Sequence, residues 1–463
     1  MNNRVIFNKD LISRYDCSGP RYTSYPTAVQ FSTDYGVEDY REWVDDSNND
    51  PIPTALSLYL HIPFCDTICY YCGCSKIVTK DKDKAPSYVE LLKKEIAIQG
   101  TLFDKDRPVT QIHWGGGTPT FLDDDTISDI FDTIKQHFNV PEGDSGEFGI
   151  EVDPRTVNED RIARLRKLGF NRISFGVQDF NPDVQEAVNR IHSKEQIIEV
   201  INAARKNDFH SINIDLMYGL PRQTLDSFEK TIQAAIDANP DRIAVYNYAH
   251  MPDLFKPQRR INEEDLPSPG EKLKILQMTI EKLQQAGYAY IGMDHFAKQE
   301  DDLTKAQQQG TLRRNFQGYS THADCDIVAM GITAISSIGD NYSQNVRTIE
   351  EYARCIEQKE IPIFRGIELE ADDILRREII NQLMCNNYLD IKRLEKKWGI
   401  TFSKYFADAM PALETMQKDG LIEMDKNQIK VTASGRLLSR TVSMEFDRYL
   451  DKDKVGRRFS KVI

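Results

Sequence analysis

The chain has 463 residues, of which 40% are hydrophobic and 28% are charged, a composition typical of globular proteins. Its 59 lysine and arginine residues are outnumbered by 72 aspartate and glutamate residues, and the resulting formal charge of −13 excludes a general nucleic-acid-binding surface. The length allows about three domains, or one barrel-sized domain with an appendage.

The N-terminal segment has no apolar core of the signal-peptide kind, and no apolar run approaches the roughly 18 residues that a membrane span needs. We therefore expect a soluble, cytoplasmic protein without a membrane span. Four of the eight cysteines, Cys65, Cys69, Cys72 and Cys74, fall within one decapeptide. Such crowding in a chain without a signal peptide indicates metal or redox chemistry.

Short apolar runs alternate with amphipathic stretches from about residue 55 to residue 300, which is typical of βα units around a parallel sheet. The pattern predicts an α/β barrel, partial or complete, whose chemistry lies in the loops after the strands. The predicted strands are 57–62, 109–114, 148–152, 172–177, 211–217 and 242–248, with 288–293 as a candidate seventh. The predicted helices are 87–103, 126–138, 159–168, 195–206, 224–238 and 270–285.

The pattern after about residue 365 is mainly helical and includes a short strand-like segment at 427–435. This arrangement resembles a winged helix, but no lysine and arginine cluster of the DNA-reading kind accompanies it. A helical lid or packing domain is therefore the favoured interpretation. The predicted order is an N-terminal arm near the active site (1–54), the barrel (55–300), a connecting and barrel-closing segment (301–364) and a C-terminal domain (365–463).

The strongest chemical signal is the spacing Cys65-x-x-x-Cys69-x-x-Cys72, which directly follows the first predicted strand. Three thiolates on one loop can each bind one iron of a [4Fe-4S] cluster, which leaves the fourth iron open for chemistry. Structural zinc is the alternative, but it usually takes four ligands from two separate knuckles. The sequence offers no second knuckle, so it favours the cluster over zinc or free thiols.

The glycine-rich segment HWGGGTPT follows the second predicted strand and offers bare backbone to a ligand. It lacks the lysine of a phosphate-binding loop, and a simple turn is the alternative interpretation. Other residues at or soon after the ends of predicted strands would line the same mouth of a barrel, although each alone is more typical of a strand-end cap. They are Glu151, Gln178, Asp215 and Ala249.

Short motifs spread over the whole chain narrow the function: RYTSYPTA, YLHIPFCDTICYYCGC, HWGGGTPT, IEVDPR, GVQDF, the NR of AVNRIHS, DLMYGLP, YNYAHMP, RNFQGY, AISSIGD and the terminal FSKVI. With them the chain resembles, essentially end to end, the family of oxygen-independent coproporphyrinogen III oxidases, which are radical S-adenosylmethionine (SAM) enzymes. The resemblance implies an α/β fold with a radical-SAM-type partial (β/α)6 barrel, an N-terminal arm and a mainly helical, winged-helix-like C-terminal domain.

The same resemblance implies oxidative decarboxylation of coproporphyrinogen III to protoporphyrinogen IX in haem biosynthesis. A 5′-deoxyadenosyl radical derived from SAM would remove a propionate β-hydrogen, and an electron donor such as flavodoxin or ferredoxin would reduce the cluster. No protein general base is demanded. We expect a monomer that binds neither nucleic acid nor a membrane.

The resemblance also assigns site residues. It gives Cys65, Cys69 and Cys72 to the [4Fe-4S] cluster, and Tyr59, Gly116, Glu151 and Ile335 to the SAM bound to iron. It gives Tyr71, Gly117, Thr118, Gln178, Arg190, Asp215 and Ala249 to a second SAM. Cys74 and Cys325 receive no role, and Arg21 is a candidate partner for a substrate carboxylate.

Two other functions compete with this interpretation. A haem-binding chaperone on the same fold is the first, but such relatives usually lack the Gly73-Cys74 pair and the RYTSYPTA arm. The second is a zinc-containing nucleic-acid-binding protein that uses the winged-helix-like end. The net charge of −13 and the single cysteine cluster count against it.

Overall fold

The computed structural model describes residues 4–322 and 324–450, so the terminal FSKVI motif lies outside the described residues. The chain forms two compact units, each built from segments that are far apart in the sequence. We call residues 31–268 and 324–368 the barrel unit, and residues 1–30, 269–323 and 369–463 the terminal unit. Among the described residues, no helix is both long and apolar enough to cross a membrane.

Six parallel strands of the barrel unit confirm the six predicted ones, and they lie side by side in the order of the chain. Strand β1 is buried on both faces, which explains its nearly continuous apolar sequence. The strands are β1 (Leu56–Ile62), β4 (Val109–Gly116), β5 (Glu147–Val152), β6 (Arg172–Gln178), β7 (Ser211–Tyr218) and β8 (Arg242–Asn247).

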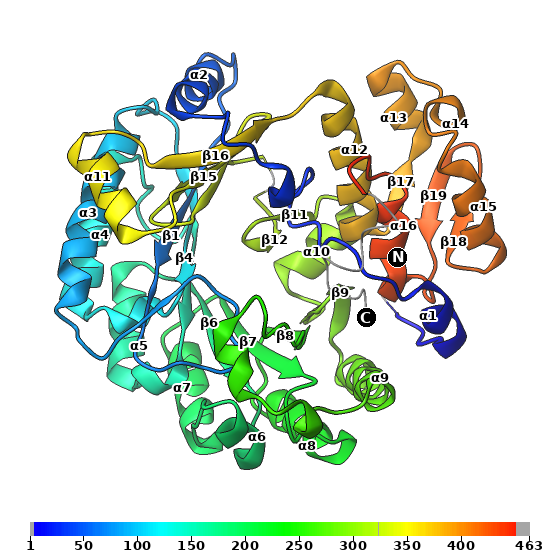
Figure 1. Ribbon diagram of the computed structural model, residues 1–463, viewed down its shortest axis with the longest axis horizontal. Coiled ribbons are helices and arrows are strands. Elements are labelled where there is room, and N and C mark those ends of the chain that lie inside the picture. Colours follow the sequence, from blue (N-terminus) through cyan, green and yellow to red (C-terminus); the bar gives the residue numbers. More distant parts are fainter. Residues whose placement is uncertain (1–3, 323, 451–463) are drawn as a thin grey trace. The chain divides into compact units, whose positions relative to one another are not determined.

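The predicted helices follow these strands, and Figure 1 shows α3, α4, α5 and α7 along the outer side of the row of strands. Their first turns are capped by side chains that accept from the backbone, as Asp123 does from Thr126 N and Thr224 from Ser227 N. The helices are α3 (Lys84–Gly100), α4 (Asp124–His137), α5 (Glu159–Leu168), α6 (Pro182–Ala187), α7 (Lys194–Lys206) and α8 (Leu225–Asp237).

Four further strands continue the sheet beyond β1, and the first of them, β13, runs parallel to β1. All four begin within residues 301–364, the segment predicted to connect and to close the barrel, although their individual positions were not predicted. These strands are β13 (Asp326–Met330), β14 (Ile335–Ile338), β15 (Asn341–Asn345) and β16 (Ile363–Glu368). The unit also contains α2 (Val37–Asn48), α11 (Ile349–Glu357) and the short pair β2 (Phe64–Cys65) and β3 (Ile77–Val78).

The terminal unit is mainly helical, and its small antiparallel sheet has the strand order β17-β19-β18. Its helices are α1 (Lys9–Tyr15), α9 (Pro269–Gln285), α10 (Asp302–Gln309), α12 (Ala371–Asn381), α13 (Ile391–Trp398), α14 (Phe402–Tyr405), α15 (Met410–Lys418) and α16 (Ser439–Met444). Its strands are β9 (Ala289–Gly292), β10 (His295–Ala297), β11 (Arg313–Asn315), β12 (Gly318–Ser320), β17 (Tyr388–Asp390), β18 (Ile422–Met424) and β19 (Gln428–Val431).

The candidate seventh strand exists as β9, but its setting differs from the prediction. It pairs antiparallel with β10 and belongs to the terminal unit rather than to the βα repeat. Only Met293 and Asp294 separate the two strands, and so short a connection produces a hairpin, whereas parallel neighbours need a crossover.

A buried carboxyl group ties α3 to the added strands. Glu95 is completely buried and accepts hydrogen bonds from Gly331 N at 2.7 Å, from Asn345 Nδ2 at 2.8 Å and from the Tyr352 hydroxyl. Burial raises the pKa of Glu95 to about 7, and the three hydrogen bonds reverse only part of that effect. The folded state therefore holds this proton more tightly than the unfolded chain does.

We expect this proton to make stability depend on pH. The stabilisation of the folded state by protonated Glu95 is fully present below the ordinary pKa of 4.5 and is lost as the pH rises through about 7. It amounts to at most about 3 kcal/mol of the free energy of unfolding. Glu95→Gln should remove that slope of the thermal midpoint between pH 5 and pH 8. The control Glu90→Gln, on the exposed face of α3, should keep it. An unchanged slope in Glu95→Gln would contradict the prediction.

Candidate functional site

A pocket of about 410 Å³ in the barrel unit brings together the segments that follow β1, β4, β5 and β6 with residues of the strands β4, β5, β6 and β7 themselves. This is the carboxyl-terminal end of the strands, where the fold class places chemistry. Eleven of the fourteen residues predicted for cluster and cofactor binding line it: Cys65, Cys69, Tyr71, Cys72, Gly116, Gly117, Thr118, Glu151, Gln178, Arg190 and Asp215.

Three predicted residues do not line this pocket. Tyr59 lies on β1, where its ring stacks on that of His113 with the centroids 6.0 Å apart. Ala249 is exposed two residues after β8, and Ile335 is the half-buried first residue of β14. Their predicted contacts with SAM remain predictions.

The three cysteines occupy one loop that begins at β2. Cys65 Sγ lies 3.5 Å from Thr118 Oγ1, and Cys69 Sγ accepts from Arg190 Nη1 at 3.5 Å. Within the described ranges, no three Cys, His, Asp or Glu side chains converge tightly enough to hold a single metal ion. A cuboidal cluster binds each thiolate at a different iron, so its ligands lie farther apart than those of one ion.

The glycine motif brings β4 against the backbone that precedes the cysteine loop. Gly117 N donates to Ile62 O and Thr118 N donates to Phe64 O, both at 2.8 Å. A Cβ atom on Gly117 would lie 2.7 Å from the carbonyl of Pro63, and Gly116 has a φ of +109° that disfavours other residues. The bare backbone therefore serves the chain's own packing as well as the pocket that it lines.

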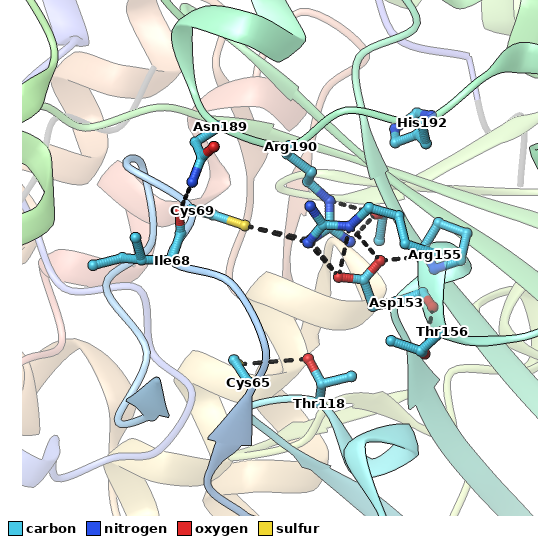
Figure 2. A network of polar contacts seen from close by, with 12 residues as sticks. Cys65, Ile68, Cys69, Thr118, Asp153, Arg155, Thr156, Asn189, Arg190 and His192 are labelled. Atoms are coloured by element: carbon cyan, nitrogen blue, oxygen red, sulfur yellow. Dashed lines mark hydrogen bonds and ion pairs between the residues drawn. The ribbon is translucent and has the colours of Figure 1, made fainter. Parts of the chain in front are cut away.

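Arg155 and Arg190 share the carboxylate of Asp153, and this network lies beside Cys69 of the cysteine loop (Figure 2). Asp153 Oδ2 accepts from Arg190 Nη1 at 3.0 Å and from Arg155 Nη2 at 2.6 Å. Burial alone would raise the pKa of Asp153, but the two arginines outweigh it and lower the pKa to about 2. Both arginines also face Cys69, with their nearest nitrogens 3.5 and 3.9 Å from its sulfur.

The sequence singled out Arg190 but passed over Asp153 and Arg155. Both belong to the IEVDPR motif, two and four residues beyond Glu151, and both line the pocket. Arginine and aspartate so close in sequence resemble an ordinary surface pair. Only the proximity of Arg190, which comes from the segment after β6, reveals a buried three-membered network.

A second set of polar groups lies on β6 and β7. Asp215 accepts from Ser174 Oγ at 2.9 Å and from Asn213 Nδ2 at 2.8 Å. Burial, followed by the negative charge of Glu151, raises the pKa of Asp215 to about 6, while those two hydrogen bonds act against it. Two carboxylates within electrostatic range of each other in one pocket can accept from several hydroxyl groups of a ligand.

Two buried oxygens of this region receive no hydrogen bond from any residue that the structure describes: Gln178 Oε1 and Asn213 Oδ1. Gln178 also has a φ of +69°, a conformation that is uncommon for a residue other than glycine and is often found at functional sites. A buried oxygen that accepts no hydrogen bond raises the free energy of the folded state. The thiols, the carboxylates and these oxygens together fit an iron–sulfur cluster and a polar cofactor rich in hydroxyl and amino groups.

Comparisons with known proteins agree with this chemistry. The model of the Radical SAM superfamily matches residues 59–235, and that of the HemN C-terminal domain matches residues 369–438. The chain is 49% identical to the oxygen-independent coproporphyrinogen III oxidase of Pseudomonas aeruginosa over 100% of both chains. It is 48% identical to the Escherichia coli enzyme of the same name over 99% of both.

A solved structure shows the same fold over nearly the whole chain. It is that of coproporphyrinogen III oxidase (HemN) from Escherichia coli, described as a radical SAM enzyme. The similarity has a TM-score of 0.91 at 46% identity and covers 96% of this chain and 100% of that one. The radical SAM fold expected from the sequence is thereby confirmed. The chain belongs to the oxygen-independent coproporphyrinogen III oxidase family of the radical SAM superfamily.

Proposed function

We propose that this chain catalyses the oxygen-independent oxidative decarboxylation of coproporphyrinogen III to protoporphyrinogen IX in haem biosynthesis. The observation that carries the proposal is the convergence in one pocket of Cys65, Cys69 and Cys72 with Gln178, whose buried Oε1 has no donor among the described residues. That pocket belongs to a chain nearly half identical, over its full length, to relatives named for this activity.

Cys65, Cys69 and Cys72 would hold a [4Fe-4S] cluster. Gly116 and Glu151 would contact the SAM bound to it, together with Tyr59 and Ile335. A second SAM would contact Tyr71, Gly117, Thr118, Gln178, Arg190, Asp215 and Ala249. When bound, the cluster and SAM supply the one-electron chemistry that removes a hydrogen atom from a substrate carbon.

The chain itself positions the cysteine loop through hydrogen bonds with the segment after α6. Asn189 Nδ2 donates to Ile68 O at 2.8 Å, and Tyr70 N donates to Val188 O at 3.0 Å. Arg190 follows directly and faces Cys69, so the segment after β6 positions both the loop backbone and a positive charge beside a thiolate. A positive charge there stabilises the thiolate that binds iron.

Glu151 takes part in orienting a ligand on the opposite side. Its carboxylate accepts from Gly116 N at 3.4 Å and contacts His113 Nε2 at 3.3 Å. Burial opposes the charge, but the hydrogen bond and charge of His113 keep the pKa of Glu151 below its ordinary value. An ionised carboxylate in the pocket wall can accept from the hydroxyl or amino groups of SAM.

The test is anaerobic incubation of the iron–sulfur protein with SAM, a reductant and coproporphyrinogen III. We expect vinyl-bearing porphyrinogen and 5′-deoxyadenosine to form together. Deoxyadenosine without decarboxylation would overturn the substrate assignment. Stoichiometric haem binding without turnover would instead favour a haem carrier on the same fold. Equilibrium dialysis with labelled SAM would count the bound molecules, for which we propose two per chain.

The partner in electron transfer and the state of assembly also belong to the proposal. A flavodoxin or ferredoxin would reduce the cluster, and the chain would work as a monomer. Sedimentation of the protein alone and product formation with each purified donor would test these two statements separately.

A further inference from the structure

A buried arginine of the terminal unit lacks partners that its charge requires. Arg314 lies on β11 and is only 8% exposed, yet its Nε and Nη1 atoms make no hydrogen bond to any described residue. Within residues 4–322 and 324–450 it forms no ion pair. Its guanidinium lies 5.0 Å from the centroid of the Tyr319 ring, which belongs to the paired strand β12.

An unpaired guanidinium is among the most expensive groups to bury. Arginine is almost never fully buried unless it is paired, and each unsatisfied donor costs free energy. Arg107 of the barrel unit shows the ordinary solution, because its buried side chain donates to Asp326 at 2.6 Å and to Asn48 at 2.9 Å. Arg314 has no such arrangement within the described residues, so its setting indicates an acceptor that residues 4–322 and 324–450 do not supply.

Two further arginines, Arg21 and Arg440, interact with Asp294, which lies between β9 and β10. Arg21 pairs with Asp294, and Asp294 acts electrostatically on both Arg440 and Tyr319. Burial, and then the charge of Arg21, lower the pKa of Arg440 to about 10, with Asp294 opposing them. The Tyr319 ring also packs against the ring of His295, the residue after Asp294, with the centroids 5.3 Å apart, so Arg314 and the Arg21–Asp294 pair lie at the same hairpin.

A second carboxylate is linked to this region, because Asp447 accepts from the Tyr22 hydroxyl at 2.9 Å and Tyr22 acts electrostatically on Arg440. Arg21 keeps 37% of its side chain exposed, so the cluster is open to a ligand at that point.

We propose that Arg314 and Arg21 form a carboxylate-binding site of the terminal unit, and that its ligand is a propionate side chain of the tetrapyrrole substrate. The inference rests on the proposed function, because that substrate carries several propionates and the reaction keeps some of them intact. The Arg314 guanidinium has the charge opposite to that of a carboxylate, and its Nε and Nη1 donors have no acceptor among the described residues. Arg440 adds positive charge to the site, and Tyr319 supports Arg314 through its ring.

Binding of coproporphyrin III, the fluorescent oxidised form of the substrate, tests the site without turnover. Fluorescence titration of wild-type protein should give tighter binding for coproporphyrin III than for its tetramethyl ester, which has no charged carboxylate. Arg314→Gln should raise the Kd for coproporphyrin III by about tenfold to a hundredfold. The same variant should bind the ester as the wild type does.

Arg313→Gln is the matched control on the same hairpin. Arg313 donates only to backbone carbonyls of its own segment, Gly310 O at 3.4 Å and Leu312 O at 3.1 Å. The Arg313→Gln variant removes the same charge one residue away from Arg314. Its Kd for coproporphyrin III should stay within about twofold of the wild-type value. An equal loss of affinity in Arg313→Gln would overturn the inference in favour of a general charge effect.

A second variant covers the case in which Arg314→Gln does not fold. Arg21→Gln replaces a half-buried side chain and should raise the same Kd, and an unchanged Kd in that variant would overturn the inference. SAM also carries a carboxylate, so the binding of labelled SAM to the Arg314→Gln variant should be measured as well. A loss of SAM affinity with unchanged porphyrin affinity would assign Arg314 to SAM and overturn the inference.

Failure of the proposed function is recognised separately. Wild-type protein that forms the vinyl product, yet binds coproporphyrin III no more tightly than the ester, overturns the inference alone. Wild-type protein that forms no product although its cluster is intact overturns the proposed function.

Discussion

Cys69→Ala should abolish formation of both 5′-deoxyadenosine and vinyl-bearing product. Cys69 is 7% exposed in the middle of the cysteine loop, and its sulfur accepts from Arg190 Nη1. An alanine there leaves one iron without its thiolate, and it also leaves Arg190 and Arg155 facing no sulfur. The expected loss is complete within the sensitivity of the assay, because the cluster would lack one of its three thiolate ligands.

Iron and acid-labile sulfide should be measured with the products, since the change acts through cluster assembly. Cys355→Ala is the matched control: this cysteine is half-buried on α11 and does not line the pocket. It should keep the iron content and the turnover of the wild type. Iron retained at the wild-type level in Cys69→Ala would contradict Cys69 as a cluster ligand.

Asp153→Asn should be the most destabilising single change at the site. It removes the carboxylate shared by Arg190 and Arg155, whose side chains are 9% and 21% exposed. Breaking a buried pair while leaving its cations in place costs about 3 to 5 kcal/mol. At about 3 kcal/mol the thermal midpoint of a unit of this size falls by about 6 to 12 °C.

The midpoint should be followed by circular dichroism in cluster-free protein, so that iron does not contribute. Asp129→Asn is the control, because Asp129 pairs with Lys93 at 2.6 Å but is 55% exposed. Its loss should cost less than about 1 kcal/mol. Equal midpoints for the two variants would show that the Asp153 network does not stabilise the barrel unit.

The βα repeat was predictable because each element carries its own local signal. β1 is a mostly apolar run, and α5 ends at Gly169, whose φ of +117° suits the left-handed cap. The strands β13 to β16 were not predicted individually, since they are short and their sequences are mixed. Their place in the sheet depends on pairing with β1 and with one another, which no local pattern specifies.

The site divides in a similar way. The cysteine spacing and the glycine motif could be interpreted from the sequence because their chemistry is local. Asp153 and Arg155 could not, since an aspartate two residues from an arginine acquires meaning only when Arg190 packs against it. Arg314 belongs to the RNFQGY motif, but its missing partners are a property of burial and not of residue type.

The sequence by itself determined the order of strands and helices in the βα repeat, the position of the cysteine loop and the family, because these depend on spacing and residue type along the chain. The tertiary structure decided which distant charges share one carboxylate, which glycine meets a carbonyl and which arginine is buried without an acceptor. Those properties arise from contacts between segments far apart in the sequence, where burial strengthens electrostatic interactions and makes every unpaired group costly.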